Sequence, residues 1–175
     1  LGTIGTEPRR VLAAARRALE PEGVVRLERA LGSDAHALAT AFAPSDVSGL
    51  ECERNVLRHL PVTEPVQLRL GPDGDAADLL RVVAAALAAK APFAVSSAVE
   101  LPARVDAALP VPCKVTSDEA WYTEVEARHA TRVRLIGGDA SALARACRGR
   151  VDLAVWADPV TEAGRVELLP FLHEQ

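Results

Sequence analysis

The residues best placed for chemistry are Gly137, Gly138 and Asp139, which follow the β-rich run RVRLI and open a helical pattern. Backbone N–H groups at a helix start attract phosphate, so Gly137 and Gly138 are weak candidates for binding a cofactor. The dinucleotide fingerprint G-x-G-x-x-G is absent, Asp139 puts a carboxylate where a phosphate would lie, and Leu143 occupies the tight helix–strand contact. We interpret the segment as a tight turn with a helix N-cap; the alternative is a weak nucleotide site.

A second glycine loop, residues 71–74, follows the run VQLRL and is a poorer candidate for the same chemistry. It carries Asp73 and is followed by Asp75, and two carboxylates repel phosphate. We therefore expect a surface turn that leads into a helix capped by Asp75.

The cysteines and histidines are scattered, without CxxC or any spacing typical of metal ligands. An activated thiolate needs a helix N-terminus, a cation or a paired base, and none is indicated near Cys52, Cys113 or Cys147. Ser96 and Ser97 end a predicted strand but lack the G-x-S-x-G of a nucleophile elbow. We expect no catalytic and no metal-binding residue in this chain.

The sequence alternates β-rich runs with helical runs, and this alternation predicts a largely parallel sheet that would position the glycine loops. Helical runs separate the β-rich segments, so crossover connections are expected. One of these helices is predicted to follow Ser117-Asp118-Glu119, a strong N-terminal signal. The predicted strands are VQLRL (66–70), FAVSS (93–97), CKVT (113–116), RVRLI (132–136) and DLAVW (152–156).

The first 43 residues predict three helices, from an N-cap at Thr6 to about Leu19, from about Val24 to Gly32, and from an N-cap at Ser33 to Phe42. The run APSDVSG (43–49) predicts a linker. We divide the chain into a helical extension with linker, 1–48, and an α/β domain, 49–175.

Near the C-terminus, Glu162-Ala163-Gly164 predicts a hairpin turn between Val160 and Val166. The expected fold is therefore α/β and Rossmann-like, with a mostly parallel open sheet, flanking helices, an N-terminal helical extension and a C-terminal β-hairpin.

Composition excludes several classes of function. A net charge of −4 gives no electrostatic reason for binding nucleic acid. No apolar run approaches the roughly 18 residues of a membrane span.

Three cysteines without paired spacing disfavour a disulfide framework, so we expect a cytoplasmic protein. There is no methionine, and Leu1 is an unfavourable start, so we expect part of a longer polypeptide.

Two stretches, SGLECERNVLRHLP (48–61) and VWADPVTEAGRVELLPFLHEQ (155–175), resemble the C-terminal region of long bifunctional proline-utilisation flavoenzymes of actinobacterial type. These enzymes fuse an FAD-dependent proline dehydrogenase to an NAD-dependent glutamate-semialdehyde dehydrogenase. They end in an extra domain with an aldehyde-dehydrogenase-like, Rossmann-type fold and no active site. The resemblance covers about residues 30–175, although His59 stands where an aromatic residue is expected.

The resemblance implies a domain that covers the aldehyde dehydrogenase site or the channel for its intermediate, and that adds assembly surface through a β-flap at Val160–Leu169. Its partners would be the catalytic domains of the same polypeptide and a second subunit. The parent enzyme would use NAD and FAD, and this segment would use neither. The implied interface residues are Glu53, Arg54, Asn55, Arg58, Val160, Arg165 and Glu167.

We therefore expect a non-catalytic lid or assembly element. One alternative is a fragment that retains NAD binding or aldehyde dehydrogenase activity. Another is a free-standing interaction module, for which the arginine pairs 9/10 and 16/17 of the first helix are the motivating feature.

Overall fold

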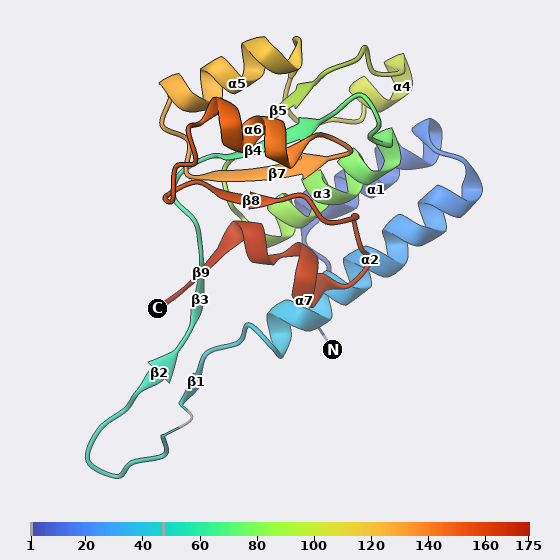
Figure 1. Ribbon diagram of the computed structural model, residues 1–175. Helices are drawn as coiled ribbons and strands as arrows, with labels where there is room; N and C mark the ends of the chain where they lie inside the picture. The colour runs from blue at the N-terminus through green and yellow to red at the C-terminus, as the bar shows by residue number, and fades with distance from the viewer. Residues whose placement is uncertain (1, 47) are drawn as a thin grey trace.

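The computed structural model describes residues 2–46 and 48–175, and its centre is a five-stranded parallel sheet (Figure 1). The strand order is β6-β5-β4-β7-β8, and every neighbouring pair is parallel. This confirms the expected Rossmann-like class and all five predicted strands. The strands are β4 (Val66–Leu70), β5 (Phe93–Ser97), β6 (Cys113–Val115), β7 (Arg132–Ile136) and β8 (Ala154–Trp156).

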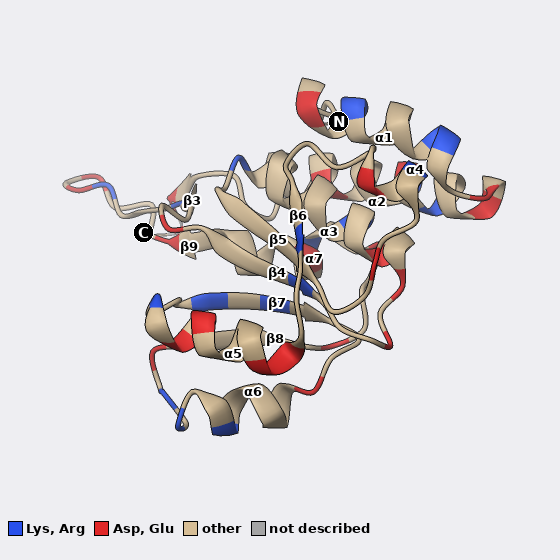
Figure 2. Cartoon of the chain, turned by 90° about the horizontal axis from the view of Figure 1, so that it is seen from above, with Lys and Arg blue, Asp and Glu red and all other residues tan. Residues whose placement is uncertain are grey.

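Helices cover both faces of the sheet, as Figure 2 shows from above. One layer contains α3 (Ala76–Ala89) and the short α4 (Ala103–Asp106); the other contains α5 (Asp118–Ala127) and α6 (Ala140–Ala146). Three of these helices begin where the sequence predicts, because the side chains of Asp75, Ser117 and Asp139 accept hydrogen bonds from the first turns.

The N-terminal helices pack onto α3 and form one hydrophobic core with it. α1 (Thr6–Ala18) follows an N-cap at Gly5, so Thr6 is not the cap that the sequence suggested. α2 (Pro21–Ala39) is one continuous helix, and the predicted division at Gly32-Ser33 is wrong. An isolated glycine costs a helix only about 1 kcal/mol, and the buried contacts that follow it hold this one together.

The buried contacts of α2 after Gly32 are made with the C-terminal segment of the chain. Ser33 Oγ accepts a hydrogen bond from Gly164 N at 2.9 Å, and a Cβ on Gly164 would lie 2.6 Å from Asp34 Cα. Gly164 therefore starts α7 (Gly164–Glu167), packed on α2, and the hairpin turn predicted at Glu162–Gly164 is wrong. A 3₁₀ turn, η1 (Leu169–Phe171), and strand β9 (Leu172–Glu174) follow.

Strand β9 forms an antiparallel pair with β3 (His59–Pro61), from the middle of the chain. Before β3, the chain makes a two-stranded protrusion, in which β1 (Ser45–Asp46) pairs with β2 (Val56–Leu57). The protrusion extends away from the body in Figure 1. The protruding two-stranded segment of this chain is thus formed by β1 and β2, whereas the predicted hairpin region Val160–Leu169 contains α7. Part of the predicted linker lies in β1, and Val47 lies outside the described residues.

Among residues 2–46 and 48–175, no helix combines the length and the apolar character that crossing a membrane requires.

Candidate functional site

The point at which strand order reverses is the place to look for a ligand. In an open parallel sheet, ligands bind beyond the carboxyl ends of the strands at such a switch point. Here it lies between β4 and β7, so the loops that follow these strands, 71–75 and 137–139, border the crevice. Both glycine loops singled out from the sequence are thus brought together at one site.

The two loops bond to each other across the switch point. Gly71 N donates to Ile136 O at 2.8 Å, and Asp73 N donates to Gly137 O at 3.2 Å. Gly74 N donates back to Gly71 O at 3.1 Å, closing the first loop on itself. These bonds hold the first loop against the end of β7 and against Gly137.

The close packing of the two loops explains why glycine occupies positions in both of them. Gly137 has a φ of +64°, a conformation that glycine adopts without strain. A Cβ on Gly137 would overlap the backbone of Asp73 and Gly74, and one on Gly71 would overlap Gly137 O. A Cβ on Gly138 would lie 2.6 Å from Leu135 Cδ1. Close approach of the two loops requires Gly71 and Gly137, independently of any cofactor.

What remains of the crevice is small and acidic. A hollow of about 280 Å³ is lined by loop residues and by four carboxylates, Asp73, Asp75, Asp78 and Asp158. Burial raises the pKa of Asp78, against the opposing effect of Arg26, whose Nη2 lies 2.9 Å from Asp78 Oδ1. The electrostatics of this hollow disfavour a pyrophosphate.

The chain that leaves β8 crosses the same edge of the sheet and is fixed there by a buried arginine. Arg134 of β7 donates from Nε to Glu167 Oε1 at 2.6 Å and from Nη2 to Oε2 at 3.2 Å. Its Nη1 donates to the carbonyl oxygens of Trp156 and Asp158 at 3.3 and 2.9 Å. Glu167 Oε2 also accepts from Thr161 N at 3.1 Å. Residues 157–160 of this fixed segment line the hollow.

The cysteines lie apart from this site. Burial, reinforced by Asp106, raises the pKa of the Cys113 thiol to about 11, so little thiolate is present near neutral pH. Burial also raises the pKa of Cys147, and Cys52 is exposed in the protrusion. Among residues 2–46 and 48–175, no group of three His, Cys, Asp or Glu side chains is arranged to hold a metal ion.

The predicted interface residues separate into two regions. Glu53, Arg54 and Asn55 are exposed in the protrusion, and Arg58 at its base pairs its backbone with Gln175 at 3.0 and 2.9 Å.

The other three predicted interface residues lie near α7. Arg165 is exposed, whereas Val160 is half-buried and its carbonyl accepts from Arg26 at 3.1 Å. Glu167 is 2% exposed and bonded to Arg134, so its side chain is used inside the chain and offers no surface to a partner.

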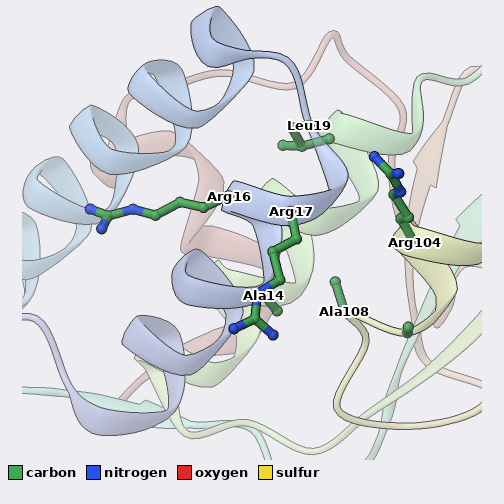
Figure 3. A pocket seen from close by; sticks show the side chains of 7 residues that line it. Ala14, Arg16, Arg17, Leu19, Arg104 and Ala108 are labelled. Carbon is green, nitrogen blue, oxygen red and sulfur yellow. The ribbon is translucent and has the colours of Figure 1, made fainter.

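A second hollow was not predicted from the sequence. It lies between the end of α1 and α4, has a volume of about 680 Å³, and is open to solvent (Figure 3). Three arginines from two helices are among its lining residues, although the Arg16 side chain points away from Arg104 (Figure 3), and we call this hollow the basic groove. Its lining residues are Ala14, Arg16, Arg17, Leu19, Arg104, Ala107 and Ala108.

Comparison with known proteins shows a similarity to a solved structure. No protein-family model matches the chain, and no curated protein matches it. A solved structure of Proline Utilization A (PutA) from Corynebacterium freiburgense is similar over 93% of this chain, with 27% sequence identity and a TM-score of 0.54. The chain spans 14% of the length of that protein. The similarity thus joins nearly the whole of this chain to a small part of a much longer protein of proline utilisation.

Proposed function

We propose that this chain is a non-catalytic domain of a proline-catabolic enzyme, and that it covers a catalytic region and contributes assembly surface. The observation that carries the proposal is the closed switch point, where the 71–75 and 137–139 loops bond to each other. A Rossmann-like sheet whose two switch-point loops bond to each other, around a hollow lined by four carboxylates, keeps the scaffold of a dinucleotide-binding domain and disfavours the dinucleotide.

The similarity to Proline Utilization A supports the class of parent enzyme. The resemblance of residues 48–61 and 155–175 to the bifunctional proline-utilisation family agrees with it. A folded α/β layer without chemistry of its own can wall off a cavity and slow the escape of a reactive semialdehyde. The protrusion 45–57 supplies an exposed contact surface that a partner can cover.

Size-exclusion chromatography tests the covering role. The chain is mixed with a separately produced aldehyde dehydrogenase region of a proline-utilisation enzyme from the same source. We expect co-elution, because a lid must bind the region that it covers. Separate elution at every concentration would contradict the covering role and would favour a free-standing interaction module.

A further inference from the structure

The face of the sheet that carries α5 has an apolar half and a polar half. Over β7, Val133 and Leu135 pack against Trp121 and Val125 of α5. Residues that pair across neighbouring parallel strands point to the same face, so the register identifies the other members of this face. On β4, β5 and β6 they are Gln67, Arg69, Ala94, Ser96 and Lys114. The apolar half is packed under α5, and the polar half is left partly open.

A hollow of about 290 Å³ lies against the polar half, and we call it the sheet pocket. Its volume is at the lower end of the range of about 300–1,000 Å³ for ligand pockets, so it suits a small molecule. Every residue of the polar half except Arg69 lines it. The other wall includes Trp121, Glu124 and Arg128 of α5, whose spacings of three and four residues place them on one side of the helix.

Trp121 offers an unused hydrogen-bond donor to this pocket. The residue lines the pocket and is only 2% exposed. In the part of the chain that the structure describes, no group accepts a hydrogen bond from its indole N–H. A buried tryptophan N–H usually has a partner, so this donor marks a position where a ligand can supply the acceptor.

The indole ring is fixed in place before any ligand arrives. The guanidinium carbon of Arg69 lies 5.1 Å from the centre of the Trp121 ring. Arg69 is itself held, because its Nε and Nη2 donate to Asp118 Oδ1 at 3.1 and 2.6 Å and its Nη2 donates to Thr116 O at 2.9 Å. A wall that is already ordered lowers the entropy cost of binding.

The charged side chains of the pocket favour an anion. Two cations, Lys114 and Arg128, and one carboxylate, Glu124, line it, which leaves a net charge of +1. Lys114 and Glu124 are hydrogen-bonded to each other, and this bond, with a weaker attraction from Arg128, lowers the pKa of Glu124. Arg128 forms no ion pair with any described residue.

The positions of Arg128 and Trp121 set the form of the ligand. A guanidinium binds a carboxylate through two parallel hydrogen bonds, whereas an indole N–H needs only a neutral acceptor. Seven residues separate the two along α5, roughly 10 Å of helix axis, and long helical side chains lean toward the N-terminus and shorten that gap. A cation at the end of α5 also favours the helix dipole, but the dipole gives no use to the Trp121 N–H.

We propose that the sheet pocket binds a short-chain carboxylate that carries an acceptor oxygen, such as a ketone, toward the other end of its chain. The carboxylate pairs with Arg128, the second oxygen accepts from the indole N–H of Trp121, and the methylene groups lie over Ala94. This site goes beyond the covering role and does not rest on it, because the 175-residue chain alone contains every group that it needs.

Nuclear magnetic resonance of the ¹⁵N-labelled chain tests the site with levulinate (4-oxopentanoate) as the probe. The chain has two tryptophans, so its spectrum shows two indole N–H signals, and Trp156→Phe identifies the signal of Trp121. We expect a saturable downfield shift of the Trp121 signal, with a midpoint on the order of 1 mM for a small ligand in a half-open site. The Trp156 signal should stay in place, and sodium chloride at the same ionic strength should move neither signal.

Two comparisons separate the two contacts. Pentanoate lacks the ketone and leaves the Trp121 N–H without a partner, so its midpoint should be at least roughly threefold higher. Arg128→Gln should raise the levulinate midpoint at least roughly fivefold, because a charge-assisted pair is lost. The matched control is Arg17→Gln on α1, which should leave the midpoint unchanged. Both arginines are exposed, and far-ultraviolet circular dichroism verifies that each variant keeps the fold.

Three results would each overturn the proposal. They are the absence of a saturable shift of the Trp121 signal, an equal shift with sodium chloride or pentanoate, and an unchanged midpoint in Arg128→Gln. Co-elution with the aldehyde dehydrogenase region is measured separately, so failure of this site is distinguishable from failure of the covering role.

Discussion

Replacing Asp34 with alanine is expected to lower the free energy of unfolding by about 3–5 kcal/mol. Asp34 is fully buried in α2 and forms a two-pronged ion pair with Arg81 of α3, with both N–O distances at 2.7 Å. Arg81 also donates from Nε to Thr161 O at 3.0 Å. Without the carboxylate, a guanidinium that is 3% exposed keeps its charge and loses its partner. Urea denaturation monitored by circular dichroism measures the loss.

The matched control is Glu7→Ala, which removes the ion pair between Glu7 and Arg10. Its N–O distance is also 2.7 Å, but both side chains are more than half exposed. We expect a loss of about 0–1 kcal/mol there. A double variant, Asp34→Leu with Arg81→Met, removes both buried charges and should recover most of the stability. Equal losses at Asp34 and Glu7 would show that burial does not govern the effect.

Gly137→Ala is expected to destabilise the fold by about 2–5 kcal/mol, the sum of backbone strain and overpacking. The residue has a φ of +64°, and its added Cβ would overlap the backbone of the 71–75 loop. Differential scanning calorimetry would record the change as a lower melting temperature. The loss should occur without any cofactor present, because the contact that is broken lies between two loops of the chain.

The control variant Gly149→Ala separates the backbone strain from the overpacking. Gly149 has nearly the same φ, +65°, but no atom lies within 4 Å of its added Cβ. We expect only the strain, about 1–2 kcal/mol. If Gly137→Ala were no more destabilising than Gly149→Ala, the loops would not be packed as tightly as the closed switch point requires.

The sequence predicts the central sheet well because its signals are local. Apolar five-residue runs mark the strands, and Asp75 and Asp139 mark the helix starts that they cap. The candidate site is located for the same reason, since both glycine loops follow predicted strands and parallel strands place their carboxyl ends together.

The errors arise where distant residues decide the outcome. From the sequence, Gly164 is predicted to lie in a turn. In the structure it packs closely on α2, where it contacts Ser33, 131 positions earlier in the chain. Strand β1 is hidden in a segment with linker composition, because only its pairing with β2 makes it a strand. The basic groove combines α1 with Arg104, which no spacing along the chain connects.

Buried arginine–carboxylate ion pairs are a structural feature that sequence reasoning missed. Arg69, Arg81 and Arg134 each meet their carboxylate partner 33 to 49 positions away along the chain. An available signal was the arginine inside the apolar strands VQLRL and RVRLI, since a buried charge in a strand requires a partner.

Isothermal titration of NAD into the chain, up to about 1 mM, tests the central claim most directly, because this range covers ordinary enzyme affinities. A switch point closed by its own loops and rimmed by four carboxylates predicts no heat beyond dilution. A saturable heat with a stoichiometry of one NAD per chain would contradict the account, since it would require the 71–75 and 137–139 loops to open for a pyrophosphate.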